Sequence, residues 1–227
     1  MAIRCQREKW AEKKLAIAAR VAERLKLIPT IKMVAVTGAL AMKNSDQDDD
    51  IDLLIVTARG RLWLTRLLTV LIVELVAQRR RPGTVKVRDK ICLNMFLDES
   101  YLSIPPKERD LYSAHEICQL QPLWNKDNLY LRFLRENSWA KNFLPNGMEI
   151  KKLGKGEIEG KKVSVFNYLI SQLLNYCELL ARFLQLKYMS SRRTTEVIEP
   201  GRLRFHPHDC REKILVEYKK RLENLSS

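Results

Sequence analysis

Apolar and polar residues follow each other along the first hundred positions in a way that predicts helices and strands in turn. Residues 4–27 carry apolar side chains at three- and four-residue steps around a charged face, which predicts an amphipathic helix ending at Pro29. Short apolar, β-branched runs predict three strands, at residues 32–37, 51–57 and 90–97. The apolar segment 61–80 predicts a helix between the second and third strands, so this part of the chain has an α/β pattern.

The pattern changes after Pro105 and Pro106, where helical periodicity dominates. We predict helices at residues 108–119, 128–142, 163–189 and 209–225, with Asp209 as the N-cap of the last one. Residues 194–205 form either an irregular segment or a short hairpin. The sequence therefore predicts two domains, an α/β domain over residues 1–100 and an all-helical domain over residues 101–227.

The composition excludes several classes of protein. With 227 residues, of which 46% are apolar, the chain can build a core and is neither disordered nor fibrous. Five widely spaced cysteines without a CxxC pair argue against a disulfide framework or a structural zinc site, and favour the cytoplasm. The N-terminus lacks an apolar signal region, and charged residues interrupt both long apolar segments, so we expect no membrane span.

The net charge of +14 is concentrated in the flanks of the chain. Residues 1–32 contribute +6 and residues 101–227 contribute +7, whereas residues 33–100 contribute +1. Lys and Arg gain affinity for nucleic acids by releasing counterions, so RNA is the expected partner, with a soluble basic surface as the alternative. Four arginines near Tyr188 and Phe205 either contact nucleic acid or form a basic loop, namely Arg192, Arg193, Arg202 and Arg204.

The most informative stretch is VAVTGALAMKNSDQDDDIDLLIVT, residues 34–57. Gly38 follows a strand and permits a sharp turn into a short helix. Asp50 and Asp52 lie two residues apart at the start of the next strand, so both carboxylates project from one face of it. Two like charges this close need a cation, and paired oxygen ligands suit Mg²⁺. A solvated acidic turn is the alternative interpretation of the acid run.

This stretch resembles the nucleotidyltransferase superfamily typified by DNA polymerase β. Gly38-Ala39 is followed by ten residues and then by Asp50-Ile51-Asp52-Leu53, which is the spacing of the family signature. The resemblance covers about residues 30–100 and implies an α/β (α+β) palm with a mixed sheet. It implies that Asp50 and Asp52 are catalytic and bind Mg²⁺ or Mn²⁺, and that the NTP triphosphate lies against Thr37, Gly38 and Ala39.

The stretch departs from the family pattern at two positions. Ala39 replaces the usual Ser or Gly, although its backbone amide can still donate a hydrogen bond. The family often places a third acidic residue on a later strand, where this sequence has Asn94. Asn94 could ligate a metal through its amide oxygen, and Asp98, four residues on, is the substitute candidate for the third carboxylate. Three cations are candidate phosphate or acceptor contacts, or ordinary surface residues: Lys43, Arg61 and Arg66.

The expected function is a metal-dependent, template-independent nucleotidyltransferase. It would transfer a nucleoside monophosphate from an NTP to a hydroxyl acceptor, with an RNA 3′ end, for example that of a tRNA, as first choice. One alternative is an antitoxin-type minimal nucleotidyltransferase that acts on or binds a partner protein. The other is a degenerate, non-catalytic nucleic-acid-binding module, which the residues Ala39 and Asn94 would suit.

Overall fold

A computed structural model describes residues 2–148, 165–190, 197–205 and 211–226 of the chain. Its strands are β1 (Ile31–Val36), β2 (Ile51–Thr57), β3 (Ile91–Asp98), β4 (Gln121–Asn125), β5 (Val197–Glu199) and β6 (Arg202–Arg204). Its α-helices are α1 (Ala2–Leu25), α2 (Gly38–Ala41), α3 (Leu62–Val76), α4 (Leu111–Gln119), α5 (Leu129–Glu136), α6 (Val165–Ser190) and α7 (Arg211–Ser226). Two 3₁₀ helices, η1 (Pro106–Glu108) and η2 (Ser138–Asn142), complete the described elements.

The six strands form one mixed sheet in the order β4-β1-β2-β3-β6-β5. Only β2 and β3 are parallel, and α3 connects them, whereas the other neighbours are antiparallel. This confirms the predicted mixed sheet. Strand β2 is central and buried along most of its length, which explains why its sequence is a continuous apolar run.

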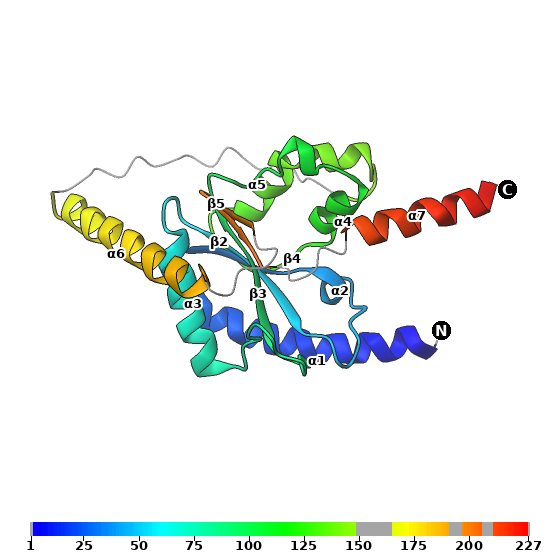
Figure 1. The fold of residues 1–227 in the computed structure, drawn as a ribbon, viewed down its shortest axis with the longest axis horizontal. Coiled ribbons are helices and arrows are strands. Elements are labelled where there is room, and N and C mark those ends of the chain that lie inside the picture. The colour runs from blue at the N-terminus through cyan, green and yellow to red at the C-terminus, as the bar shows by residue number, and fades with distance from the viewer. Residues whose placement is uncertain (1, 149–164, 191–196, 206–210, 227) are drawn as a thin grey trace.

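Helices cover both faces of the sheet (Figure 1). Helices α1 and α3 pack on one face, in a core that includes Val34, Ile55 and Phe96. Helices α4 and α5 pack on the other face, against Leu54 and Val56. Residues Asp50 and Asp52 have the same parity along the chain as Leu54 and Val56, so they belong to the α4 side of the molecule.

The region after residue 100 is not all-helical, because β4, β5 and β6 belong to it. β4 pairs with β1, and β6 pairs with β3, so the sheet crosses the predicted domain boundary. The sequence pattern did not predict β4, because its sequence, QPLWN, contains Pro122 and no β-branched residue. A proline is tolerated there because β4 is an edge strand.

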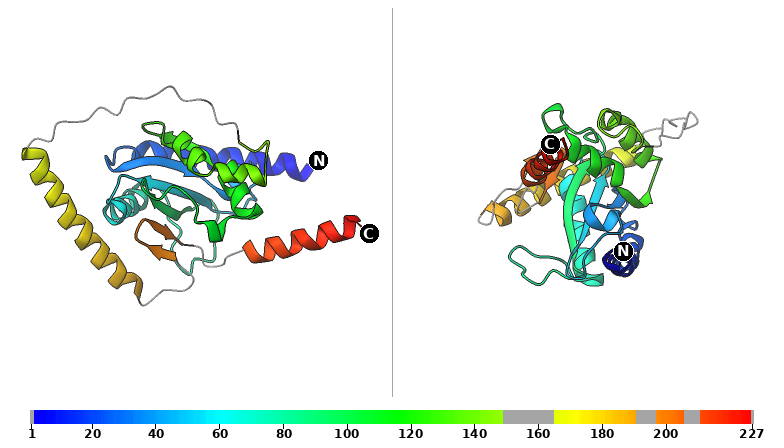
Figure 2. Two further views of the ribbon diagram at one scale, coloured as in Figure 1. Left: turned by 90° about the horizontal axis from the view of Figure 1, so that it is seen from above. Right: turned by 90° about the vertical axis from the view of Figure 1, so that its right-hand side faces the viewer.

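The other sequence predictions for this region have mixed outcomes. The short-hairpin alternative is confirmed by β5 and β6, which extend the sheet beside β3 (Figure 2). The helix predicted over 61–80 ends earlier, at Val76. The N-cap predicted at Asp209 and the arginines Arg192 and Arg193 lie outside the described residues.

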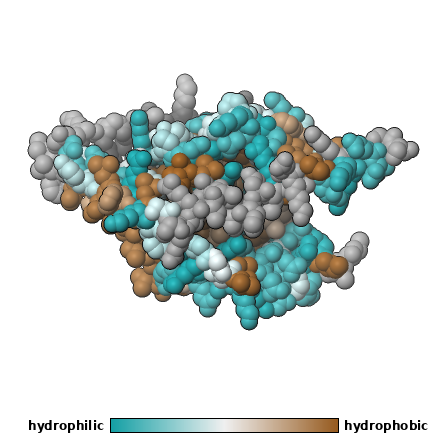
Figure 3. Space-filling model, viewed as in Figure 1, coloured by the Kyte–Doolittle hydropathy of each residue, from teal (hydrophilic) through white to brown (hydrophobic). Residues whose placement is uncertain are grey.

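Two surface properties complete the description of the fold. Large apolar side chains are exposed along α6 and on the adjoining part of α3, among them Tyr176, Phe183 and Leu75 (Figure 3). Within the described residues, no helix combines the length and the apolar character that a bilayer crossing requires.

Candidate metal site and the adjoining pocket

Asp50, Asp52 and Cys92 form a cluster of three possible metal ligands. Asp50 immediately precedes β2, Asp52 is the second residue of that strand, and Cys92 lies opposite Asp52 in the parallel β2–β3 register. One ligand atom from each residue lies within 4.8 Å of the others. The predicted juxtaposition of the two carboxylates is therefore observed, and Cys92 is an addition that the sequence pattern did not indicate.

The Asp52 carboxyl is electrostatically unusual. Burial, reinforced by the charge of Asp50, raises the pKa of Asp52 from 3.8 to about 7. A hydrogen bond from the Cys92 thiol and the charge of Arg80 oppose this rise only in part. Burial and the two nearby carboxylates in turn raise the pKa of Cys92 far above its usual range, so its thiol is protonated at neutral pH.

Arg80 is the one cation that directly contacts this cluster among the described residues. Its Nη1 lies 2.6 Å from Oδ2 of Asp50, whose side chain is 13% exposed. Backbone hydrogen bonds join Gln78 and Arg80 to Ile91 at the start of β3, and they hold the arginine at this place. One guanidinium therefore faces two carboxylates, which leaves the cluster short of positive charge.

A buried lysine fixes the loop that leads into Asp50. Lys14 of α1 is 1% exposed, and its Nζ donates to the carbonyl oxygens of Gln47 and Asp49 at 3.1 and 2.6 Å. The same ammonium forms an ion pair with Asp89 at 2.9 Å. The Asp49 carboxylate accepts from the backbone of Asp46 at 2.6 Å, so it shapes the turn and does not join the cluster. The acid run thus combines a structural turn with the two carboxylates that face the α4 side.

The turn after β1 lies against the Asp52 carboxylate. The Thr37 amide donates to the backbone oxygen of Asp52 at 3.2 Å. Gly38 has φ of +64°, and a Cβ there would lie 3.5 Å from Oδ2 of Asp52. The predicted proximity of Thr37 and Gly38 to the acid pair is therefore observed. Ala39 and Lys43 are exposed on and just after α2, and their predicted phosphate contacts stay predictions.

The structure does not bring Asp98 or Arg61 to this cluster. Asp98 lies opposite Thr57, at the far end of β2. Thr57 is five residues from Asp52, which corresponds to roughly 16 Å along the strand. Its carboxylate accepts from the Gly60 amide at 2.5 Å and so caps a loop. Arg61 is also at that end and donates to Asn175 at 2.8 Å. Regular alternation along β3 would place Asp98 on the same face as Asn94, but the irregularity between Leu93 and Met95 pairs Asp98 with Thr57. Thr57 has the opposite parity to Asp52, so Asp98 lies on the other face of the sheet as well as at the other end of the strand.

Two other predicted residues have different environments. Arg66 lies over the ring of Phe205 at 4.6 Å and bonds Gln185, so it belongs to the packing of α3 against α6. Asn94 is 5% exposed, and its Oδ1 has no hydrogen-bond partner. It occupies an irregularity in the β2–β3 register, where Leu53 pairs with Leu93 and Leu54 with Met95. Such a bulge can redirect a side chain, and here Asn94 faces a pocket beside the cluster.

This α4 pocket is a cavity of about 90 Å³ between the sheet and α4, and it is continuous with open solvent. Its floor includes Thr37, Leu54 and Asn94, and its α4 wall includes Tyr112, Glu116 and Ile117. Arg202, Arg204 and Arg211 line it as well, and they approach from β6 and α7. The mixture of an apolar lining with a few polar groups is typical of a ligand pocket.

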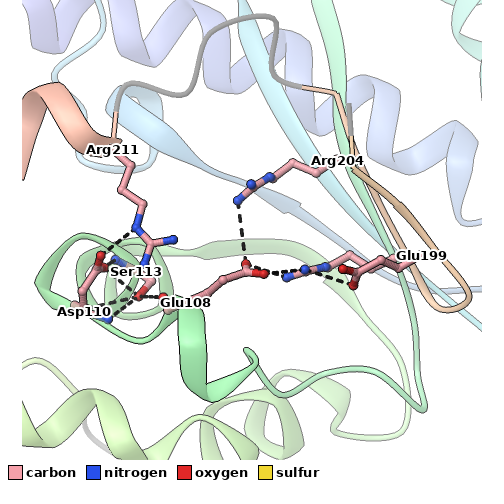
Figure 4. A network of polar contacts seen from close by, with 7 residues as sticks. Glu108, Asp110, Ser113, Glu199, Arg204 and Arg211 are labelled. Atoms are coloured by element: carbon pink, nitrogen blue, oxygen red, sulfur yellow. Dashed lines mark hydrogen bonds and ion pairs between the residues drawn. The ribbon is translucent and has the colours of Figure 1, made fainter. Parts of the chain in front are cut away.

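Ion pairs hold the arginine side of the α4 pocket in place (Figure 4). Arg202 donates to both carboxylate oxygens of Glu108, at 2.7 and 2.8 Å, and Arg204 lies 3.9 Å from the same group. Arg211 donates to Asp110 at 2.6 Å. Asp110 also caps α4 by accepting from the amide of Ser113, so these pairs join α4 to β6 and α7. The sequence left Arg202 and Arg204 as either nucleic-acid contacts or a basic loop. In the structure they line a pocket, and nucleic-acid contact stays a prediction.

The donor set of the cluster fits a hard divalent cation. Mg²⁺ and Mn²⁺ prefer carboxylate oxygens, which Asp50 and Asp52 supply, and in the metal-free protein the Cys92 thiol donates a hydrogen bond to Asp52. The raised pKa of Asp52 shows that its charged form lacks stabilisation in the metal-free protein, and a bound cation would supply that stabilisation. Comparison of the sequence with protein-family models and with curated proteins finds no match, so the assignment depends on these side chains.

Replacing Gly38 with alanine is expected to cost about 1–2 kcal/mol of stability, because a left-handed φ strains any residue with a Cβ. The new methyl would also lie against the Asp52 carboxylate, and we expect about tenfold weaker Mn²⁺ binding by calorimetry. Gly60→Ala is the matched control, since its φ is +66° and a Cβ there meets nothing within 4 Å. Equal loss of metal affinity in both variants would contradict a role for Gly38 beside the carboxylates.

Proposed function

We propose that the protein is a metal-dependent nucleotidyltransferase that transfers a nucleoside monophosphate from an NTP to a hydroxyl acceptor and releases pyrophosphate. The observation that carries the proposal is the placement of Asp50 and Asp52 at the start of β2, where their ligand atoms lie close together and Asp52 lies against the Gly38 turn. The spacing of these residues is that of the family signature. The mixed sheet with a possible metal site is compatible with that resemblance.

Each residue of the site has a definite task in this proposal. Asp50 and Asp52 would hold Mg²⁺ or Mn²⁺, which when bound would stabilise the negative charge that develops on the transferred phosphate. Thr37, Gly38 and Ala39 would line the triphosphate, and Lys43 would add a cation from the end of α2. Arg80, which can leave Asp50 for a phosphate oxygen, would position the leaving group, since its fork of donors suits phosphates.

RNA is the acceptor that the charge distribution favours. Basic residues are concentrated in the two flanks of the chain, and phosphate contacts by Lys and Arg supply most of the affinity for nucleic acids. No feature of the cluster distinguishes a nucleic-acid hydroxyl from a protein hydroxyl. A partner protein as acceptor, the antitoxin-type alternative, is therefore one outcome of the experiment.

A second candidate function is a nucleic-acid-binding module without catalysis. One observation favours it, because the Arg80 guanidinium already provides Asp50 with a cation at 2.6 Å. If that ion pair is permanent, the carboxylates stabilise the fold and bind no metal. The two candidates differ in whether Mn²⁺ binds and whether turnover occurs.

The decisive experiment uses NTPs labelled at the α-phosphate, one base at a time, with Mg²⁺ or Mn²⁺. Total RNA, DNA oligonucleotides and partner protein co-purified from the source cell are offered as acceptors, and Asp50→Ala/Asp52→Ala is the control. Label that enters RNA only with the wild type is the expected result. Label in protein would support the antitoxin-type function. RNA binding without turnover or Mn²⁺ binding would support the non-catalytic module.

A further inference from the structure

Glu116 is a carboxylate that has no partner among the residues that the structure describes. It lies on α4 and lines the α4 pocket, and it is partly buried. None of the described residues makes a hydrogen bond or an ion pair with its side chain, although Glu108 and Asp110 nearby are both paired with arginines. A charged group that is desolvated without compensation costs stability, so its retention calls for a role outside folding.

Two polar atoms on the floor of the same pocket also lack partners. Oγ1 of Thr37 and Oδ1 of Asn94 are buried, and neither has a hydrogen-bond partner in the described structure. Both residues line the pocket together with Glu116. The cavity of about 90 Å³ exceeds the space that one water molecule needs, so the residues that line it leave room for a ligand.

The chemistry of the three groups selects the ligand. The Asn94 amide oxygen and the Glu116 carboxylate accept hydrogen bonds, and the Thr37 hydroxyl can donate or accept one. A molecule that brings hydroxyl donors satisfies such a set, and the vicinal hydroxyls of a ribose are of this kind. Leu54 and Ile117 offer apolar contact for a ring.

The pocket adjoins the Asp50–Asp52–Cys92 cluster. The Thr37 amide donates to Asp52, and Gly38, the next residue, lies against the Asp52 carboxylate. The charge of Glu116 is also close enough to influence Asp52. A hydroxyl seated beside Glu116 would therefore be near a phosphate bound at the two aspartates.

We infer that the α4 pocket binds the terminal ribonucleoside of the acceptor, and that Glu116 takes the proton from the attacking hydroxyl. This inference rests on the proposed nucleotidyltransferase function. In the step, the acceptor O–H bond breaks and its proton passes to the Glu116 carboxylate. The oxygen bonds to the α-phosphorus, and the bond from the α-phosphorus to the bridging oxygen breaks, so pyrophosphate leaves with the electron pair. Glu116 would supply the third carboxylate that the sheet lacks at Asn94.

The surroundings of Glu116 suit a general base. The charged groups that face the pocket are Glu108 from η1, Arg202 and Arg204 from β6, Arg211 from α7 and, beyond them, Asp52 from β2. Arg202 and Arg204 share Glu108, Arg202 also pairs with Glu199, and Arg211 pairs with Asp110, so carboxylates offset the charge of these arginines. Burial alone raises the pKa of Glu116, which brings a carboxyl group closer to the working pH.

The test compares Glu116→Gln with Glu136→Gln, which makes the same chemical change on the outer side of α5. With an RNA acceptor and the preferred NTP, we expect Glu116→Gln to lower kcat by about 10²–10⁴-fold. At Mg²⁺ concentrations that saturate Asp50 and Asp52, the wild type should lose activity as the pH falls through the pKa of Glu116, and the variant should lack this component of the pH dependence. Glu116→Asp should recover part of the rate, and thermal unfolding with and without Mg²⁺-NTP should show that both glutamine variants fold and bind nucleotide.

A second variant tests the pocket independently of the proton transfer. Asn94→Leu removes a buried acceptor that has no partner, so we expect higher stability together with a raised KM for RNA. A wild-type rate and pH profile in Glu116→Gln, or loss of Mg²⁺-NTP binding in it, would overturn the assignment of Glu116. An unchanged KM for RNA in Asn94→Leu would overturn the assignment of the pocket. A wild type that is inactive on every acceptor would instead overturn the proposed function, and this inference with it.

Discussion

Asp52→Asn is expected to abolish nucleotide transfer and, at the same time, to make the metal-free protein more stable at pH 8. Loss of one of two metal ligands removes several kcal/mol of charge stabilisation, which corresponds to a rate reduced by at least about 10³-fold. The gain in stability has a separate cause. At pH 8 the folded wild type must keep a buried carboxylate ionised beside Asp50, and asparagine carries no such charge.

The pH dependence of this gain follows from the direction of the shift. The pKa of Asp52 is about 7 in the folded protein and 3.8 ordinarily, so between these values the folded state holds a proton that the unfolded state has lost. The stability that this proton confers is complete below about pH 4 and disappears as the pH rises through 7. Asp52→Asn should therefore equal the wild type at pH 4 and exceed it by roughly 2–4 kcal/mol at pH 8, at about 1.4 kcal/mol per pKa unit.

Asp50→Asn provides the comparison, because Asp50 is already paired with Arg80. Its replacement leaves a partly buried guanidinium without a partner, so we expect lower stability at pH 8 together with loss of activity. Urea unfolding at both pH values, with and without Mn²⁺, measures these effects. Mn²⁺ should stabilise only the wild type. Lower stability of Asp52→Asn at pH 8 would mean that Asp52 is compensated by groups other than a metal.

The sequence predicted the part of the site that depends on local geometry. The two-residue period of a strand places Asp50 and Asp52 on one face, and this requires no knowledge of the tertiary structure. The same holds for Gly38, since a turn after β1 must follow where the apolar run stops. The central strand β2 was predicted to the residue because its apolar run is bounded by a polar loop at either end.

Residues that join the site from other elements were missed for a physical reason. Cys92 and Arg80 reach the aspartates only through the β2–β3 register and the backbone bonds at Ile91, and neither is encoded in local sequence. The position of Glu116 near the site depends on how α4 packs on the sheet. The sequence offered only weak hints, namely a basic run after α3 and one acid on a short amphipathic helix.

The misplacement of Asp98 shows a further limit of sequence reasoning. The register shift beside Asn94 interrupts the alternation along β3, so Asp98 pairs with Thr57, on the opposite face from Asp52 and at the other end of β2. Similarly, the region after residue 100 looked all-helical because its strands are short, with three to five residues each. Strands of that length on or near sheet edges obtain their stability from pairing with β1 and β3, so they leave little pattern in the sequence.

Lys14→Met is expected to destabilise the protein by about 2–4 kcal/mol. The Lys14 ammonium is buried and donates to two carbonyl oxygens, of Gln47 and Asp49, besides its ion pair with Asp89. Methionine has a similar length but no donor, so two backbone acceptors lose their partner, at about 1–3 kcal/mol each. The recovered cost of burying the ammonium offsets a part of this loss. Urea unfolding at pH 7 measures the change.

Replacing Lys14 should also weaken metal binding. Its acceptors belong to the turn directly before Asp50, so without the ammonium this turn loses its anchor to α1, and we expect weaker Mn²⁺ binding as well as lower stability. Lys13→Met is the matched control, since Lys13 is exposed on the same helix, and it should change stability by less than about 0.5 kcal/mol. Asp89→Asn should have a milder effect than Lys14→Met, because the Asp89 side chain is 43% exposed and water can replace its partner. The prediction would be contradicted if Lys14→Met matched the Lys13→Met control in both stability and Mn²⁺ affinity. In that case the loop before Asp50 would keep its shape through its own hydrogen bonds, from Asp46 and Ser45 to Asp49, and α1 would only cover it.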